Sequence, residues 1–258
     1  MRKTTSWGKA AGWYSNLLEK SSKSYQKDLI LPNLLRLLQL KKEEVVLDLA
    51  CGQGFFAREF AKTGVKVVGA DISKELIEIA RHLPGAQKRH LKIEYHVASS
   101  DQLGFLEDKS VDKAVIVLAL QNIEKVGETL KETVRILKEK GRLFIVLNHP
   151  AFRIPKKSSW GWDDKLKTQY RRLDGYLSES NEQIQMHPGE NPKEKTMSFH
   201  RPLQYYFKTL TNSGFLISRL EEWTSNRESE PGPRKNIEDS ARREFPLFLF
   251  LEAIKKAQ

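Results

Sequence analysis

The sequence has few of the features that mark secreted or membrane-spanning proteins. It contains a single cysteine, Cys51, so it cannot form an internal disulfide, which is typical of a protein in a reducing compartment. No apolar run approaches the ~20 residues that a membrane helix needs. No apolar segment with a small-residue cleavage site follows the basic start at Met1 and Arg2. We therefore expect a folded, cytoplasmic protein.

The charge is of mixed sign, and no long basic tract is present. The chain of 258 residues has 44 Lys and Arg against 33 Asp and Glu, which gives a net charge of +11. Basic and acidic residues are interleaved, as in Lys138-Glu139-Lys140. This balance favours acidic partners such as phosphates, carboxylates or nucleic acid, but it does not select among them.

Apolar runs and helical periodicity alternate along the first part of the chain. Short apolar strands are expected at 45–49, 65–70, 93–98, 114–118 and 143–147, with helices at 55–62, 73–82 and 126–137 between them. Such βαβ units produce a parallel sheet that is covered on both faces. A helix at 203–212 and strands at 215–223 and 248–254 follow, the strands pairing as an antiparallel edge. The fold class predicted is α/β, with a doubly wound, mostly parallel seven-stranded sheet.

A glycine turn follows the first strand. Gly52 and Gly54 allow close approach of a ligand to the backbone beside a helix N-terminus, and Asp71 ends the second strand, where a carboxylate can accept ribose hydroxyls. Together they indicate an adenosine-containing ligand. The spacing Gly52-x-Gly54-x-x-Ala57 also fits a dinucleotide fingerprint. Asp48 favours a different cofactor, because a buried acid in the first strand has no role on a pyrophosphate but can orient a cationic amino acid moiety.

The segment Asp48-Leu49-Ala50-Cys51-Gly52-Gln53-Gly54 resembles motif I of class I S-adenosylmethionine-dependent methyltransferases, especially the type 11 and ubiquinone-biosynthesis group. Residues 111–115, 118–123 and 201–215 resemble later segments of that group. The resemblance implies a Rossmann-like fold and S-adenosylmethionine as cofactor, with S-adenosylhomocysteine as product. It also implies in-line methyl transfer to a small-molecule acceptor.

The resemblance implies a set of cofactor-binding residues. Where the family often has an Asp that meets the adenine amino group, this chain has Ser99, and Asp101 is expected to take that role from a shifted position. Tyr14 and Tyr25 resemble aromatic positions that close over the cofactor, with packing inside a helical core as the alternative. The full predicted set is Asp48, Ala50, Gly52, Gly54, Asp71, Ile72, Ser99, Ser100, Asp101, Leu118, Tyr14 and Tyr25.

Candidates for catalysis and acceptor binding follow the fifth strand. His149 lies at the carboxyl edge of the sheet, where it is placed to accept a proton, and the alternative is that it fixes the turn at Asn148 and Pro150. Aromatic rings and guanidinium groups after it are candidates to bind an aromatic or acidic acceptor, or else to pack a lid and pair with nearby acids. The predicted acceptor-binding residues are Arg153, Trp160, Trp162, Tyr170, Arg171 and Arg172. No metal site is predicted.

These expectations divide the chain into four parts. Residues 1–40 are expected to form helices that cover the cofactor site, 41–148 the cofactor-binding core, 149–200 an inserted lid, and 201–258 the last helix and two strands of the core. Three other functions fit the sequence less well: an RNA methyltransferase, an NAD-dependent oxidoreductase and a catalytically silent cofactor-binding protein. The positive charge supports RNA, but no RNA-binding module is recognisable.

Overall fold

The computed structural model describes residues 24–83, 91–185 and 195–257. The predicted cofactor residue Tyr14 and the first part of the N-terminal helical region lie outside these ranges. None of the helices within them has the length and apolar character needed to cross a membrane.

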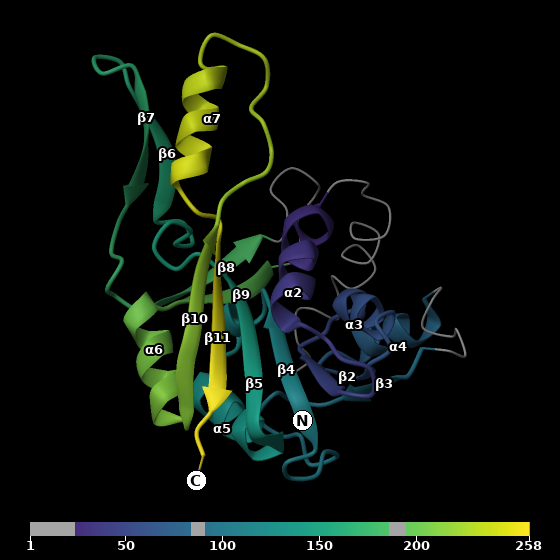
Figure 1. The fold of residues 1–258 in the computed structure, drawn as a ribbon. Coiled ribbons are helices and arrows are strands. Elements are labelled where there is room, and N and C mark those ends of the chain that lie inside the picture. The colour runs from purple at the N-terminus through teal and green to yellow at the C-terminus, as the bar shows by residue number, and fades with distance from the viewer. Residues whose placement is uncertain (1–23, 84–90, 186–194, 258) are drawn as a thin grey trace.

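A seven-stranded sheet in the order β10-β11-β5-β4-β1-β2-β3 forms the centre of the molecule (Figure 1). The strands are β1 (Val45–Leu49), β2 (Lys66–Asp71), β3 (Ile93–Val97), β4 (Val111–Val117), β5 (Leu137–Asn148), β10 (Phe215–Trp223) and β11 (Phe248–Lys255). The first five are parallel, and β11 pairs antiparallel with both β5 and β10. The predicted fold class is confirmed. The antiparallel strand lies one place in from the edge, and β10 forms the edge itself.

Helices cover both faces of the sheet. The N-terminal helices η1 (Gln26–Ile30) and α2 (Leu31–Leu38) pack on one face with α3 (Phe55–Ala61) and α4 (Lys74–His82). The other face is covered by α5 (Val126–Ile136) and α6 (Leu203–Asn212). Alternate strand residues point into the two apolar layers: Val46 and Phe144 into the first, Leu47 and Ile145 into the second. This is the burial on both faces that the unbroken apolar strands predicted.

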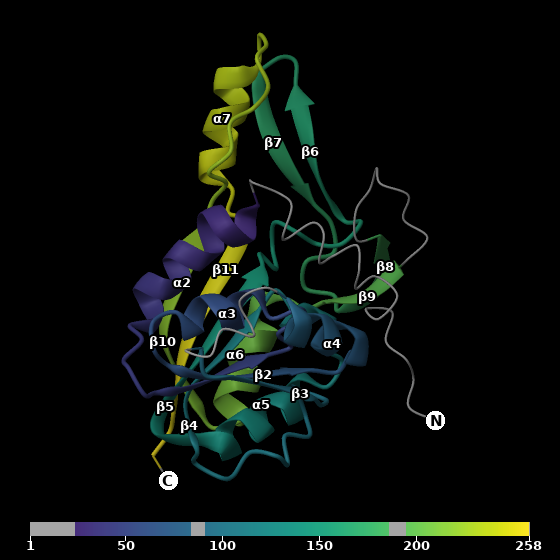
Figure 2. The same ribbon diagram turned by 90° about the vertical axis from the view of Figure 1, so that its right-hand side faces the viewer.

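The segment after β5 forms two separate hairpins. One consists of β6 (Ser158–Asp163) and β7 (Thr168–Leu173), the other of β8 (Ser180–Gln185) and β9 (Lys195–His200). Figures 1 and 2 show both hairpins beyond the carboxyl ends of the parallel strands, with β6 and β7 beside α7 (Lys235–Glu244). No helix was predicted between the last two strands, and α7 gives little apolar signal because it buries only Ala241.

Candidate functional site

The turn between β1 and α3 has an unusual backbone. Ala50, Gly52 and Gly54 all have left-handed conformations, with φ of 58°, 56° and 74°. At Gly54 a side chain is also excluded by packing, since a Cβ there would lie 2.8 Å from ring carbons of Tyr95. A left-handed residue other than glycine is strained, and such strain is concentrated at functional sites. The turn thus contains two glycines and one strained alanine, all in left-handed conformations.

Asp48 is buried under this turn. Its side chain is 2% exposed, and Oδ2 has no hydrogen-bond partner among the described residues. Burial raises the pKa of Asp48 to about 7, and the nearby charge of Asp71 acts in the same direction. A backbone hydrogen bond from Ala57 and the charge of Arg58 oppose the rise. A buried carboxylate with a free oxygen is costly unless a cationic group pairs with it.

Asp71 ties the end of β2 to the glycine turn. Its Oδ2 accepts a hydrogen bond from the backbone N of Gly52 at 2.9 Å, and its Oδ1 accepts one from the backbone N of Ser73 at 2.8 Å. Burial raises the pKa of Asp71, while these two hydrogen bonds lower it. Each carboxylate oxygen keeps a second lone pair, so Asp71 can also accept from a ligand.

A pocket of about 740 Å³ opens at the carboxyl ends of β1, β2 and β4. Of the predicted cofactor residues, the pocket is lined by Asp48, Ala50, Gly52, Asp71, Ile72, Ser99, Ser100, Asp101 and Leu118. Gly54 does not line the pocket and packs against the side chain of Tyr95. The structure therefore brings nine of the predicted residues together around one cavity.

The serine pair and Asp101 already have internal partners. The hydroxyl of Ser99 donates to Oδ1 of Asp101, and Nζ of Lys125 lies 3.4 Å from Oδ2. The Ser99 hydrogen bond is the main reason that the pKa of Asp101 is lowered. The hydroxyl of Ser100 pairs with that of Thr129 at 2.8 Å. Asp101 is therefore an oriented, ionised acceptor at the pocket wall.

Leu118, which was predicted, and residues of the hairpin β8–β9, which were not, also line this pocket. Leu118 follows β4 with a left-handed φ of 53°, and its carbonyl oxygen accepts from the side-chain amide of Gln121 at 2.8 Å. The hairpin of β8 and β9 adds Asn181, Met197 and Phe199. Along β9 the neighbours of Met197 and Phe199 are buried, so the strand alternates. In the sequence this strand is an alternation of polar Thr196, Ser198 and His200 with apolar Met197 and Phe199.

Four of the predicted residues gather around a second, smaller pocket of about 220 Å³. Arg153, Trp160 and Arg171 line it together with Tyr25. Tyr25 was predicted to close over the cofactor, but it does not line the larger pocket. Its hydroxyl pairs with Ser225 at 2.9 Å and its ring packs edge-on against Phe248. These contacts agree with the alternative of packing, and a role of Tyr25 over the cofactor stays a prediction.

The other three predicted acceptor residues line neither pocket. The indole N of Trp162 donates to Asp164 at 3.0 Å. Tyr170 is 47% exposed. Arg172 forms an ion pair with Asp174 at 2.9 Å. Arg172 thus pairs with a nearby acid, as the alternative expected, and Trp162 and Tyr170 lie on the hairpin β6–β7 outside both pockets.

His149 is buried in the turn that follows β5. Its Nε2 lies 2.7 Å from Oε1 of Glu222, and its Nδ1 accepts from the backbone N of Ala151 at 3.2 Å. The proton is therefore assigned to Nε2, which donates to Glu222. Burial lowers the pKa of His149, against the effect of Glu222. Both ring nitrogens are in use and the ring lines neither pocket, so this geometry favours a role in fixing the turn over a role as general base.

We expect His149→Ala to lower the melting temperature without changing the affinity for S-adenosylhomocysteine. The substitution leaves Glu222 and two backbone N–H groups without their partner, at a cost of about 2–3 kcal/mol. Differential scanning fluorimetry and calorimetric titration measure the two effects. Unchanged stability together with lost turnover would restore His149 as a catalytic candidate.

Comparison with known proteins gives one matching family model, described as a methyltransferase domain, over residues 47–145. A ubiquinone biosynthesis O-methyltransferase of Pelagibacter ubique is 36% identical over 103 residues, which is 39% of this chain and 40% of that protein. A demethylmenaquinone methyltransferase of Tropheryma whipplei is 35% identical over 116 residues, 45% of this chain and 46% of that protein. The chain thus spans less than half the length of these relatives.

Solved structures extend the likeness of the fold over most of the chain. An S-adenosylmethionine-dependent methyltransferase of Mesorhizobium loti has a TM-score of 0.68 at 24% identity, covering 90% of this chain and 100% of that one. The [4+2]-cyclase SpnF has a TM-score of 0.63 at 15% identity, covering 99% and 97%. One fold therefore accompanies different chemistries, and activity has to be argued from the site. Residues 47–145 thus match a methyltransferase-domain model, and the chain as a whole has the class I methyltransferase fold.

Proposed function

We propose that this protein binds S-adenosylmethionine in the larger pocket and transfers its methyl group to a small-molecule acceptor. The observation that carries the proposal is the buried Asp48 with a free Oδ2 at the wall of a cavity of about 740 Å³. When bound, the cofactor would supply a sulfonium methyl group: a nucleophilic atom of the acceptor would bond to the methyl carbon in line, and the carbon–sulfur bond would break to release S-adenosylhomocysteine.

The residues of β1 and β2 fit the parts of this cofactor. Asp48 offers a carboxylate oxygen to the amino group, and the strained turn at Ala50 exposes backbone to the amino acid part. Asp71 accepts from the ribose hydroxyls. Ile72, which is 51% exposed, offers an apolar surface to the adenine ring. This arrangement supports S-adenosylmethionine over a dinucleotide, since a pyrophosphate beside Asp48 would place like charges together.

The acceptor is expected on the side of β4 and of the hairpin β8–β9. Leu118, Met197 and Phe199 make this wall largely apolar, which suits a flat or apolar small molecule better than an RNA backbone. The names of the relatives, which refer to ubiquinone and menaquinone biosynthesis, support the same class. In this proposal residues 149–200 act as the lid that excludes water, and residues 1–40 cover the cofactor. The chain contributes chiefly by positioning the two reactants.

The test uses cofactor with an isotopically labelled methyl group, incubated separately with a metabolite extract and with RNA. We expect label in a small molecule and none in RNA. Label confined to RNA would contradict the choice of acceptor, and no label in either would favour a catalytically silent protein.

We expect Asp71→Asn to weaken S-adenosylhomocysteine binding by about tenfold or more, because an amide cannot accept from Gly52, Ser73 and a ribose as a carboxylate does. Calorimetric titration measures the change. The matched control is Asp112→Asn, which also removes a carboxylate that accepts from a backbone N, that of Val45 at 2.8 Å. Asp112 does not line the pocket, so its substitution should leave the affinity unchanged. Equal affinities in the two variants would refute the ribose assignment.

A further inference from the structure

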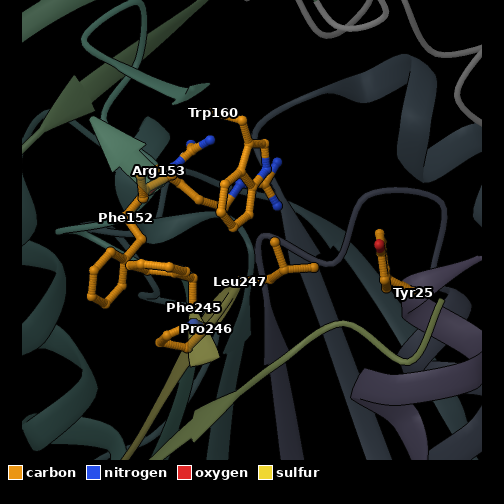
Figure 3. A pocket seen from close by; sticks show the side chains of 8 residues that line it. Tyr25, Phe152, Arg153, Trp160, Phe245, Pro246 and Leu247 are labelled. Carbon is orange, nitrogen blue, oxygen red and sulfur yellow. Dashed lines mark hydrogen bonds between the residues drawn. The ribbon is translucent and has the colours of Figure 1, made fainter. Parts of the chain in front are cut away.

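The smaller pocket is built from four separate segments of the chain. Tyr25 comes from the N-terminal helical region, Phe152 and Arg153 from the turn after β5, Trp160 and Arg171 from the hairpin β6–β7, and 245–247 from the connection between α7 and β11. Figure 3 shows Phe152, Trp160 and Phe245 gathered on one side and Tyr25 on the other. Its lining is separate from that of the larger pocket, with no residue in common.

The charge of this pocket is of one sign. Among the eight described residues that line it, two are arginines and none is acidic. The guanidinium group of Arg153 has no hydrogen bond or ion pair with any described residue, and it lies 5.7 Å from the ring centroid of Phe248. By contrast, Arg172 on the neighbouring strand β7 forms an ion pair with Asp174 at 2.9 Å. Arg153 therefore presents unused donors to the cavity.

Arg171 is held in place beside it. Its Nε and Nη2 donate to the carbonyl oxygen of Phe152 at 2.9 and 2.7 Å, and Nη2 also donates to the hydroxyl of Ser158 at 2.9 Å. No described residue accepts from Nη1. Because these hydrogen bonds already fix the guanidinium group of Arg171, little further side-chain entropy is lost when a ligand binds to it.

The two guanidinium groups have an unfavourable environment in the absence of an anion. Burial lowers the pKa of Arg153 and of Arg171, and the charge of Arg153 lowers the pKa of Arg171 further. A carboxylate or phosphate group between them would relieve both effects and accept charge-assisted hydrogen bonds.

The remaining walls are aromatic. Phe245 packs edge-on against Phe152 and against Trp160, with ring centroids 5.4 and 5.3 Å apart. Arg171 lies over the ring of Trp160 at 5.2 Å. Trp160 is still 36% exposed, so part of its surface remains free for a ligand. Aromatic walls of this kind favour offset or edge-on contact with another ring.

We propose that the smaller pocket is a binding site for a single-ring aromatic anion, with Arg153 and Arg171 on its acidic group and Trp160 and Phe245 on its ring. The volume of about 220 Å³ fits this size, since a cavity of ~150 Å³ holds benzene. The site goes beyond the proposed methyl transfer and does not depend on it.

The turn that carries Arg153 is itself fixed. The backbone N of Arg153 donates to the carbonyl oxygen of His149 at 2.9 Å, and the backbone N of His149 donates to Leu247 at 2.8 Å. His149 thus joins the two segments that supply Arg153 and Leu247 to the pocket. It is a positioning residue for this site.

The test is a calorimetric titration of the full-length protein with benzoate and with phenyl phosphate, which distinguish a carboxylate from a phosphate. We expect one of them to bind with a Kd between about 10 µM and 1 mM, as small ligands of this size do in preformed sites. Benzamide, which has the ring without the charge, and acetate, which has the charge without the ring, should each bind at least tenfold more weakly.

Arg153→Gln should weaken binding of the aromatic anion by tenfold or more, and Trp160→Leu should also weaken it. Arg172→Gln removes the same charge from β7 outside the pocket and should leave the Kd unchanged. The far-ultraviolet circular dichroism spectrum, which should be unchanged in all three variants, shows that each is folded. The proposal is refuted if neither anion binds at 10 mM, if benzamide binds equally well, or if Arg153→Gln and Arg172→Gln have the same effect.

Discussion

Replacing Asp48 by asparagine should stabilise the ligand-free protein at pH 8 and at the same time weaken its binding of S-adenosylhomocysteine. At that pH the buried carboxylate is ionised, because burial raises its pKa only to about 7. Because the pKa of Asp48 rises from 3.8 to about 7, the ionised carboxylate lowers the free energy of unfolding by at most about 4 kcal/mol. The neutral amide avoids this cost but offers a weaker partner to a cationic amino group.

The sign of the pH dependence follows from the same shift. An acid with a raised pKa holds its proton more tightly in the folded protein than in the unfolded chain. The free energy of unfolding should therefore fall as pH rises from 3.8 to about 7, and Asp48 should contribute no further change above that. Chemical denaturation of the ligand-free protein at several pH values measures this trend.

Cofactor binding should have the opposite pH dependence, because only ionised Asp48 pairs with an ammonium group. With a pKa of about 7, the affinity for S-adenosylhomocysteine should rise about 20-fold between pH 5.5 and 7.5. Asp71 has a raised pKa as well, so Asp48→Asn is the variant that separates the two acids. If the affinity of Asp48→Asn for S-adenosylhomocysteine kept the full pH dependence, Asp48 would not be the group that pairs with the amino group of the ligand.

The second large effect is expected for Gly54→Ala, which should lower the free energy of unfolding by about 3 kcal/mol or more. Alanine is strained at a φ of 74°, and its Cβ would lie 2.8 Å from ring carbons of Tyr95. That ring is 8% exposed and has little room to move. The backbone N of Gly54 also donates to Cys51, so the turn and the cofactor affinity should be disturbed together.

Gly104→Ala is the matched control, because no atom lies within 4 Å of a Cβ placed there. Thermal denaturation should show a decrease of roughly 10 °C in the melting temperature for Gly54→Ala and little change for Gly104→Ala. Equal melting temperatures would mean that Tyr95 does not fill the space behind the turn.

The sheet was predictable because its strands are short, apolar and separated by periodic helices. The run from Ala114 to Val117 is a central strand as its composition indicated. The helix α7 was not predictable in this way, since it is polar apart from Ile237 and Ala241 and packs beside β7 rather than on the core. The position of β11 inside the edge also depends on long-range pairing that no local pattern reveals.

The cofactor side of the site was predictable for a similar reason. Asp48, Gly52 and Asp71 lie at strand ends that a parallel sheet brings to one edge. The hairpin residues Met197 and Phe199 reach the pocket only through tertiary folding, so their sequence context gave no sign of it. His149 was placed at the correct edge, but only the structure reveals that Glu222 and the backbone occupy its ring nitrogens.

The central claim is that the pocket at Asp48 and Asp71 holds S-adenosylmethionine, and calorimetric titration with S-adenosylhomocysteine and, separately, NADH tests it most directly. We predict binding of S-adenosylhomocysteine with a Kd in the micromolar range, lost or strongly weakened in Asp71→Asn, and no binding of NADH. Binding of NADH without binding of S-adenosylhomocysteine would contradict the account and identify the glycine turn as a dinucleotide site.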